Sequence, residues 1–194
     1  MKDRIIEDYR PFLSNLSEIS YDSEHRVSLI QDKKPNHRMY NFDGISDKFS
    51  KKTRGEKNMS CDGYYEKASG DTYLIEFKNQ EEGQIDKRWL KNKIYDSIST
   101  IVMNENIARK DVAGRTTVIV VYNDKNKEPL NDQSYSTSPA FNKFSQKMAY
   151  LAEKRGIDSY DKKFDLVRYK GLLFKDVYTV DKEIFEKDFM DVIF

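Results

Sequence analysis

The stretch Met59–Gln80 reads MSCDGYYEKASGDTYLIEFKNQ, and its pattern decides which fold we expect for the chain. Its last apolar run, TYLIEFK, alternates between two kinds of side chain. Successive side chains of a β-strand point to opposite faces, so this alternation predicts a strand. Glu76 and Lys78 are then expected on one face, and Ile75 and Phe77 on the other.

A tight turn is expected between the two apolar-aromatic runs of this stretch, because Ala68–Asp71 contains the Ser, Gly and Asp of a hairpin loop. The turn would bring the strand that carries Asp62 back against the strand that carries Glu76 and Lys78. Two carboxylates and a main-chain carbonyl can hold Mg²⁺ and leave room for a phosphate. Such an ion polarises a phosphoryl oxygen and lowers the pKa of a bound water, while an ammonium steadies the developing charge. The stretch therefore indicates a metal-dependent nuclease.

These residues resemble the motif of the PD-(D/E)XK phosphodiesterase superfamily, which includes type II restriction endonucleases, Holliday-junction resolvases and some bacterial toxin domains. The resemblance implies an α/β (α+β) fold with a restriction endonuclease-like core, in which helices flank a central mixed β-sheet. It also implies that Asp62, Glu76 and the carbonyl of Phe77 bind Mg²⁺ or Mn²⁺, and that Lys78 is the catalytic lysine. The chain departs from the motif at Cys61, which stands where the family has its eponymous proline.

Acidic-x-lysine triplets are common in a chain with 35% charged residues, and Asp32–Lys34 and Asp161–Lys163 also match. Both lie in polar stretches without a strand pattern. The triplet Glu76–Lys78 ends an apolar run and has a second carboxylate upstream, which favours it as the site. The alternative is a solvated strand face with a cross-strand ion pair.

The segments around the hairpin supply the other expected elements of the core. Helical spacing of Leu90, Ile94, Ile98, Ile101 and Val102 predicts an amphipathic helix, and the β-branched run Arg115–Tyr122 predicts a buried strand. An N-terminal helix is expected from Ile5, Ile6, Tyr9, Leu13 and Leu16, which Pro11 must kink or begin. Many relatives add a glutamate of the first helix to the metal site, and Glu7 and Glu18 are both candidates here.

Substrate contacts are expected from residues on both sides of the motif. After it, Gln80, Gln84, Lys87 and Lys91 are candidates, although long side chains also cover core edges with their stems and keep their charges in water. Before it lies a basic stretch with interleaved aromatic residues, predicted to be a loop that grips nucleic acid or else a solvated surface. Its members include Lys51, Lys52 and Arg54.

The remainder of the chain is interpreted as part of one domain of residues 1–194, with a core of about 1–123 and a C-terminal elaboration of about 124–194. The elaboration is expected to hold four elements. These are a polar loop (Asp124–Ser138), a helix with the apolar face Phe141, Phe144, Met148, Leu151 and Ala152, a hairpin of Phe164–Arg168 with Leu172–Val180, and a short helix (Ile184–Ile193).

Composition limits the setting in which this chain is expected to act. A single cysteine and a charged N-terminus without an apolar stretch predict a cytoplasmic protein, and no apolar run is long enough to predict a membrane span. A net charge of +1 argues against a protein that coats nucleic acid nonspecifically. His25 and His37 have no paired Cys or His at metal spacing, so neither a zinc site nor a histidine-metal nuclease is predicted.

Two hypotheses follow from the sequence. The first is a Mg²⁺- or Mn²⁺-dependent nuclease that cleaves nucleic acid, DNA more readily than RNA, by activated water. The second is a non-catalytic binding, immunity or regulatory protein, in which Glu76 and Lys78 form a surface ion pair. The sequence leaves open the biological role and whether the chain forms a homodimer, as many relatives do.

Overall fold

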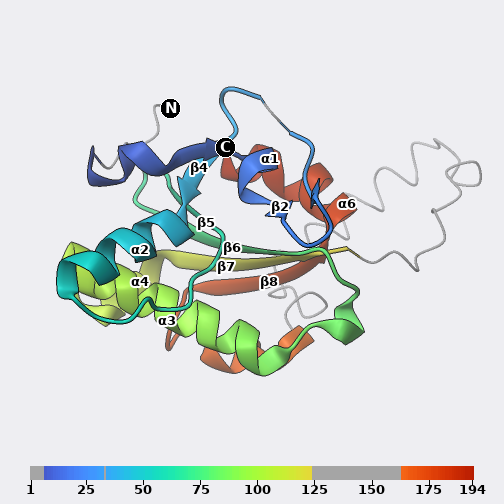
Figure 1. Cartoon of the computed structure of the whole chain (residues 1–194). Helices are drawn as coiled ribbons and strands as arrows, with labels where there is room; N and C mark the ends of the chain where they lie inside the picture. Colours follow the sequence, from blue (N-terminus) through green and yellow to red (C-terminus); the bar gives the residue numbers. More distant parts are fainter. Residues whose placement is uncertain (1–6, 33, 124–162) are drawn as a thin grey trace, which may run out of the picture.

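A mixed six-stranded β-sheet flanked by helices forms the centre of the molecule, so the protein has an α/β fold (Figure 1). The structure is a computed structural model, and it describes residues 7–32, 34–123 and 163–194. The strand order is β1–β4–β5–β6–β7–β8, antiparallel from β1 to β6 and parallel from β6 to β8. The strands are β1 (Leu13–Asn15), β4 (Arg38–Asn41), β5 (Gly63–Glu66), β6 (Thr72–Lys78), β7 (Thr116–Tyr122) and β8 (Asp176–Asp181).

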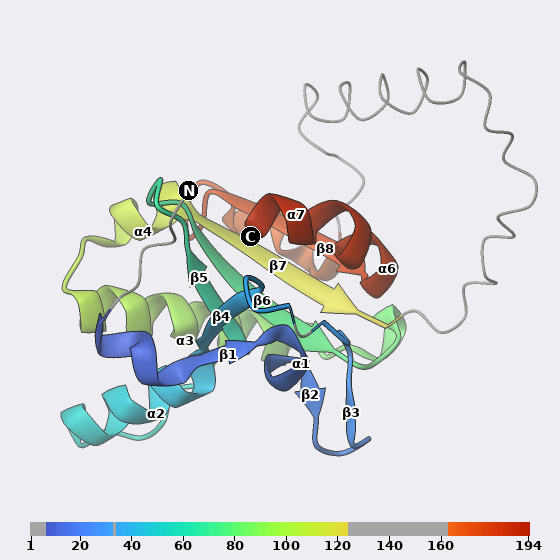
Figure 2. The same cartoon turned by 90° about the horizontal axis from the view of Figure 1, so that it is seen from above.

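Helices cover both faces of this sheet. The first face carries α2 (Phe42–Thr53), α3 (Lys87–Glu105) and α4 (Arg109–Arg115), and the second carries α1 (Leu16–Ile19) and a C-terminal helical segment (Figure 1). That segment comprises α6 (Lys182–Ile184), the π-helix η5 (Phe185–Phe189) and α7 (Met190–Ile193), and it lies over β7 and β8 in Figure 2. A separate two-stranded hairpin, β2 (Tyr21–Asp22) and β3 (Val27–Ser28), follows α1.

The side chains of β6 alternate between the two cores, as the sequence predicts. Leu74 packs in the core under α2 and α3, whereas Ile75 and Phe77 pack with the second core around Leu16 and Phe185. The register pairs Gly63 of β5 with Ile75 of β6, so the start of β5 lies beside the end of β6. This pairing is the reason that Asp62 and Glu76 meet.

The predicted hairpin loop is confirmed between β5 and β6. The amide of Lys67 donates to the carbonyl of Asp71 (2.9 Å) and that of Gly70 to the carbonyl of Lys67 (2.9 Å). Gly70 has φ of +89°, a conformation that residues with a Cβ rarely adopt.

The predicted central helix and buried strand are also confirmed. Asp86 caps α3 by accepting the amides of Arg88 (2.8 Å) and Trp89 (3.0 Å), and Asn106 ends the helix in the left-handed conformation. Strand β7 lies between β6 and β8 with nearly all of its side chains buried, which explains its continuous β-branched sequence.

The prediction of an N-terminal helix that Pro11 kinks or begins is wrong for the described residues. Residues Glu7–Phe12 form the 3₁₀ helix η1, Leu13–Asn15 form β1, and α1 begins only at Leu16. Pro11 lacks an amide donor, so an α-helix cannot pass through it unbroken, and the next three residues instead pair with β4.

The basic stretch before Asp62 is not the loop that was predicted, because it contains β4 and the whole of α2. Asn41 caps α2 by accepting the amide of Gly44 (3.1 Å), and Phe42 and Ile45 anchor the helix in the core. Phe42, Ile45 and Phe49 recur at helical spacing, so the apolar face of this helix is present in the sequence among its many charged residues.

The predicted C-terminal hairpin is also wrong. Lys163–Asp165 and Val167–Tyr169 form the 3₁₀ turns η3 and η4, and β8 pairs in parallel with β7. The buried side chains of Phe164 and Leu166 pack into the first core, which holds these turns beneath the sheet. The final helix is confirmed as the segment α6–η5–α7.

Two predicted elements, the polar loop Asp124–Ser138 and the helix around Phe141 to Ala152, lie outside the described residues. A short 3₁₀ helix, η2 (Glu82–Gln84), connects β6 to α3. Among the helices of the described ranges, none is long and apolar enough to cross a membrane.

Candidate functional site

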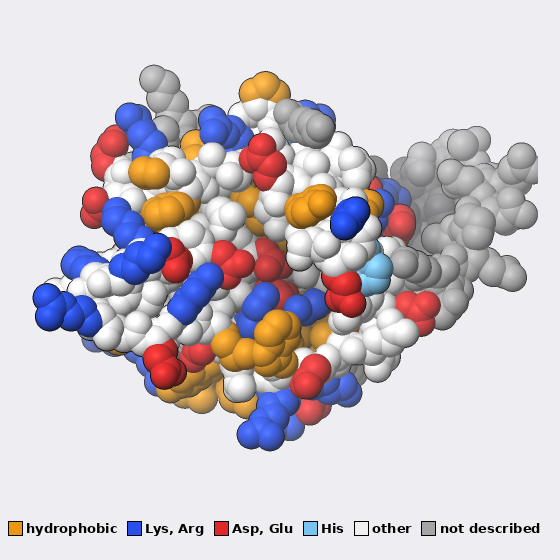
Figure 3. All heavy atoms as spheres, viewed as in Figure 1, with side chains coloured by type: hydrophobic (Ala, Val, Ile, Leu, Met, Phe, Trp, Pro, Cys, Tyr) orange, Lys and Arg blue, Asp and Glu red, His pale blue; other side chains and the backbone are white. Residues whose placement is uncertain are grey.

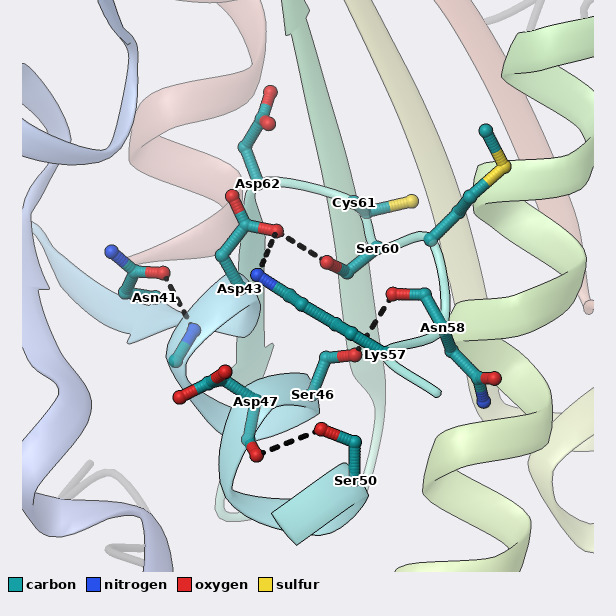
Figure 4. Close-up of polar contacts among 12 residues, drawn as sticks. Asn41, Asp43, Ser46, Asp47, Ser50, Lys57, Asn58, Ser60, Cys61 and Asp62 are labelled. Carbon is teal, nitrogen blue, oxygen red and sulfur yellow. Dashed lines mark hydrogen bonds and ion pairs between the residues drawn. The ribbon is translucent and has the colours of Figure 1, made fainter. Parts of the chain in front are cut away.

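The loop that precedes β5 is held rigidly, and it positions Asp62. At the start of α2, Asp43 accepts a hydrogen bond from the hydroxyl of Ser60 and lies 3.8 Å from the Lys57 ammonium (Figure 4). One turn further along, the hydroxyl of Ser46 donates to the carbonyl of Asn58 (3.1 Å; Figure 4). The N-terminal half of α2 therefore fixes the backbone that leads to Asp62.

Helix α3 holds the same loop from the other side. The Ser97 hydroxyl accepts the amide of Cys61 (2.8 Å), Asp96 accepts the amide of Met59 (3.2 Å), and the Thr100 hydroxyl accepts the side-chain amide of Asn58 (3.1 Å). The sulfur of Cys61 is buried, and burial raises the pKa of its thiol. The position of α3 is thus coupled directly to that of Asp62.

Four charged side chains meet where this loop, β6 and α3 converge, and we call them the carboxylate–lysine cluster: Asp62, Glu76, Lys78 and Lys93. Glu76 Oε1 lies 2.8 Å from Lys78 Nζ and 2.7 Å from Lys93 Nζ. Asp62 Oδ1 lies 3.4 Å from Lys93 Nζ, and Asp62 Oδ2 accepts the amide of Phe77 (2.7 Å). The two carboxylates therefore share Lys93, and the structure brings together the three residues that the motif predicts.

One oxygen of this cluster is left without a partner. Glu76 is fully buried, and its Oε2 atom has no hydrogen-bond partner among the described residues. A buried carboxylate oxygen without a partner costs roughly 1–3 kcal/mol or more, so such atoms usually mark a site for a further ligand. The atom is a negatively charged acceptor, and an N–H or O–H donor, a water or a cation would satisfy it.

Burial and neighbouring charges shift the pKa values of Asp62 and Lys93 in this cluster. Burial, followed by the nearby charge of Glu76, raises the pKa of Asp62 to about 7. Burial alone would lower the pKa of Lys93, but the charges of Glu76 and Asp62 outweigh it and raise that pKa above its ordinary value. Burial is the larger cause of the Asp62 shift and the charge of Glu76 adds to it, so additional positive charge beside Asp62 would favour its ionised form.

The donor set fits a hard divalent cation that keeps much of its water. Within the described part of the chain, no three His, Cys, Asp or Glu side chains converge as a ready set of ligands. Mg²⁺ is commonly held by one or two carboxylates and several waters, so Asp62 and Glu76 are a sufficient pair. Lys93 now bridges them, so an ion that uses both carboxylates has to share or displace its ammonium.

A pocket of about 460 Å³ opens beside the cluster and gives it access to solvent. The hollow in Figure 3 contains Lys or Arg and Asp or Glu side chains next to hydrophobic ones. Trp89 contributes a half-exposed ring to the pocket, and the ammonium groups of Lys78 and Lys93 lie 4.9 and 5.4 Å from the centre of that ring. The lysines are therefore held between carboxylates and an aromatic ring.

The predicted substrate residues after β6 separate into two groups. Gln80 and Gln84 line the same pocket as Asp62 and Lys78. Lys87 is exposed in the first turn of α3, outside the lining of this pocket, and Lys91 lies 3.5 Å from Asp165 on another side of the helix.

The basic residues of α2 lie at its C-terminal end, away from the pocket lining. Lys51 pairs with Asp47 at 2.6 Å, Lys52 is exposed, and Arg54 ends the helix in the left-handed conformation. Lys and Arg side chains gather over this side of the molecule in Figure 3, beside the hollow.

Neither candidate glutamate of the first helix reaches the cluster in this structure. Glu7 is exposed on η1 and lies 3.5 Å from Arg10. Glu18 accepts the amide of Asn15 (3.3 Å) in a capping box at the start of α1.

Sequence reasoning missed Lys93 and Trp89. Lys93, Ser97 and Thr100 follow one another at intervals of four and three residues, which places them on one stripe of α3 facing the Asp62 loop. That polar stripe beside the apolar one is the signal that could have identified Lys93.

Comparison with known proteins adds no relative. No protein-family model matches this chain, and neither a curated protein nor a solved structure is significantly similar to it.

Proposed function

We propose that this protein is a divalent-cation-dependent nuclease of the PD-(D/E)XK type, which hydrolyses phosphodiester bonds of nucleic acid, DNA in the first place. The observation that carries the proposal is the fully buried Oε2 of Glu76, which has no partner in the described part of the chain and lies beside Asp62, next to an open pocket. Lys78 lies within 2.8 Å of the same carboxylate, as the motif requires.

The order of elements around the cluster supports the same proposal. Three antiparallel strands, β4, β5 and β6, are followed by α3, the short helix α4 and then β7, and apart from α4 this is the order expected for a restriction endonuclease-like core. Asp62 immediately precedes the second of these strands, and Glu76 and Lys78 end the third. These are the positions at which the resemblance to the PD-(D/E)XK motif implies metal ligands, which supports the proposal.

The residues of the cluster divide the chemistry among them. A bound Mg²⁺ or Mn²⁺ would supply positive charge for the phosphoryl oxygen and lower the pKa of a water. Asp62 and Glu76 would hold the ion, and the amide of Phe77 fixes the orientation of Asp62 through its 2.7 Å bond. Lys78 offers an ammonium that stabilises negative charge on the attacking water or on the phosphate. Its contact with Trp89 restricts its rotation and keeps this charge at the pocket.

Nucleic acid would reach the cluster from the side of the basic α2 surface. Lysine and arginine side chains over α2 offer contacts to phosphates, and Gln80 and Gln84 offer hydrogen bonds inside the pocket. The half-exposed ring of Trp89 is suited to stack on an unpaired base. The acidic residues at the pocket rim, among them Asp86, disfavour a duplex lying flat against it.

Cleavage assays with Lys78→Met and Asp62→Asn test the proposal. The purified protein is incubated with linear, supercoiled, branched and single-stranded DNA and with RNA, in Mg²⁺, in Mn²⁺ and in EDTA. We expect cleavage that requires the cation and falls at least about 100-fold in each variant. Lys175→Ala is the matched control, because it removes an exposed lysine outside the pocket lining whose ion pair with Asp71 contributes little stability.

Absence of cleavage in the wild type, together with no calorimetric Mn²⁺ binding, would refute the nuclease. The alternative is then a binding or regulatory protein in which Lys93 and Lys78 permanently neutralise Glu76. The 2.7 and 2.8 Å contacts of Glu76 Oε1 are the observations that favour this alternative.

A further inference from the structure

The turn between β2 and β3 holds a second pair of polar side chains that faces the pocket. Asp22 Oδ2 lies 2.6 Å from His25 Nδ1, and Asp22 Oδ1 accepts the amides of Glu24 (2.9 Å) and His25 (3.2 Å). Because a carboxylate accepts the Nδ1 proton, this pair fixes the tautomer of the imidazole and leaves Nε2 for another partner. No hydrogen bond to Nε2 of His25 is formed by the described residues.

The pair is fastened to the end of the strand that carries Lys78. Asn79 donates its side-chain amide to Asp22 Oδ2 (3.1 Å) and accepts the side-chain amide of Asn123 through Oδ1 (2.8 Å). Although burial opposes it, bonds from His25, Asn79 and the backbone lower the pKa of Asp22 to about 2. Asp22 therefore stays ionised and holds His25 in a fixed position relative to β6.

A second Asp–His pair, Asp32 and His37, serves as a structural comparison within the same chain. His37 Nδ1 lies 2.6 Å from Asp32 Oδ2, the same separation as in the first pair. The side chain of His37 is 5% exposed and stacks on Phe194, whereas that of His25 is 48% exposed and lines the pocket. The two Asp–His pairs have the same separation, but the imidazole of His25 is exposed and that of His37 is buried. A substrate can therefore reach His25.

The surroundings of His25 are mixed in charge and come from several elements. Its own turn supplies Asp22 and Glu24, and the other charged side chains that line the pocket are Asp62, Lys78, Asp86 and Lys93. Figure 1 places the β2–β3 hairpin and α3 on opposite sides of the end of β6. A phosphate in the pocket would therefore have the carboxylate–lysine cluster on one side and His25 on another.

We propose that His25 is the general acid of this site and gives its Nε2 proton to the oxygen that leaves phosphorus, with Asp22 as its positioning residue. The inference rests on the proposed nuclease function. In-line hydrolysis needs the attacking water and the leaving oxygen on opposite sides of phosphorus, and the pocket offers functional groups on both. Histidine is suited to the role because it exchanges a proton near neutral pH.

The proton and bond changes balance without any further reactant. The oxygen of water forms a bond to phosphorus and its proton passes to solvent, while the bond from phosphorus to the leaving oxygen breaks with both electrons on that oxygen. The Nε2 proton of His25 moves to the leaving oxygen, which becomes a hydroxyl. The neutral imidazole then takes a proton from solvent, and the products are a phosphate monoester and an alcohol.

Replacing the leaving oxygen by sulfur tests this role, because a thiolate leaves without protonation. Single DNA strands carry one linkage with sulfur at the 3′- or the 5′-bridging position, and cleavage at each linkage is resolved on a sequencing gel. In His25→Gln we expect cleavage of ordinary linkages to fall at least about 100-fold, while cleavage at the sulfur linkage stays near the wild-type rate. Asp22→Asn should show the same selectivity with a smaller loss.

Other outcomes overturn the assignment. Equal loss at both kinds of linkage would make His25 a binding or structural residue, and no loss at either would make it a bystander. If the wild type cleaves neither linkage, nor any other nucleic acid of the panel above, the nuclease itself is refuted and this inference with it. His37→Gln is the matched control, expected to lower the melting temperature without selectivity between the linkages, because His37 is buried away from the pocket.

Discussion

Two clusters of buried charge lie at opposite ends of the β5–β6 hairpin, and their difference separates a site from a scaffold. The carboxylate–lysine cluster lies at the end of β6, and the other, which we call the tyrosine–arginine cluster, lies near the turn of the hairpin and the end of α3. Each borders a hollow of about 460 Å³. The members of the tyrosine–arginine cluster are Tyr9, Tyr64, Glu66, Glu105 and Arg115.

Every carboxylate oxygen of the tyrosine–arginine cluster has a partner. Arg115 lies 3.1 Å from Glu105 Oε2 and 3.9 Å from Glu66 Oε1. The hydroxyls of Tyr9 and Tyr64 donate to Glu105 Oε1 and Glu66 Oε2, each at 3.4 Å. Its buried atom without a partner is a donor, Nε of Arg115, whereas the unpartnered atom of the other cluster is the acceptor Glu76 Oε2. Under the proposed function, the carboxylate–lysine cluster is the one of the two that would take a cation.

The largest expected difference comes from neutralising one buried carboxylate in each cluster. Glu76→Gln should lower cation-dependent cleavage by about 100- to 1,000-fold, because it removes the charge that holds the ion. Glu66→Gln should leave the rate per folded molecule unchanged and lower the melting temperature, because Arg115 loses part of its compensation. Equal loss of cleavage in the two variants, measured at equal folded fraction, would contradict the division into site and scaffold.

The parts of the fold that carry local signals could be predicted from the sequence. Alternation in β6, helical spacing in α3 and the β-branched run of β7 each reflect burial on one face or on both, and such burial leaves a pattern in the sequence. The convergence of Asp62 with Glu76 and Lys78 followed from the hairpin, since the turn residues fix which ends of the two strands meet.

Elements whose state depends on distant partners could not be predicted. The three residues of β1 are a strand because β4 pairs with them, and β8 joins the sheet by parallel pairing with β7, for which the sequence between them carries no local signal. The role of Lys93 could not be predicted for the same reason. Its role arises from two carboxylates that lie 31 and 17 positions away along the chain.

A smaller difference is expected when the cation of each cluster is removed. Arg115→Met leaves two carboxylates without compensation and should cost about 3 kcal/mol of unfolding free energy, which Mn²⁺ does not restore. Lys93→Met should also lower the unfolding free energy, but Mn²⁺ should restore it. Mn²⁺ should bind this variant about tenfold more tightly than the wild type, a change of about 1.4 kcal/mol in binding free energy.

Denaturant titrations with and without saturating Mn²⁺, combined with calorimetry, measure both effects. The loss of the Lys93 ammonium removes the competitor of the ion, so weaker Mn²⁺ binding in Lys93→Met would show that this lysine assists the ion instead of occupying its place. Restoration of Arg115→Met by Mn²⁺ would contradict the assignment of the tyrosine–arginine cluster to the scaffold.

The smallest expected difference lies in the pH dependence of stability. Burial and the nearby charge of Glu76 raise the pKa of Asp62 from 3.8 to about 7, and burial also raises the pKa of Glu105. Between about pH 4 and pH 7 folded Asp62 holds a proton that the unfolded chain has lost, so stability is highest at the acid end and falls as pH rises. The slope from Asp62 is at most about 1.4 kcal/mol per pH unit.

Saturating Mn²⁺ should remove the part of this slope that comes from Asp62 and leave the part that comes from Glu105. Unfolding free energies of Asp62→Asn and Glu105→Gln, measured across this pH range, separate the two contributions. A slope in Asp62→Asn that Mn²⁺ still flattens would mean that the ion acts elsewhere on the molecule.

The ammonium of Lys93 between the two carboxylates has a consequence for how the protein folds after synthesis. Because this internal cation already balances part of the charge, the chain can complete its folding on leaving the ribosome without waiting for a metal ion. If the protein is the cation-dependent nuclease proposed above, newly made molecules would then be intact but inactive wherever free divalent ions are scarce. Ion supply would set the moment at which they start to work, independently of how many have been synthesised.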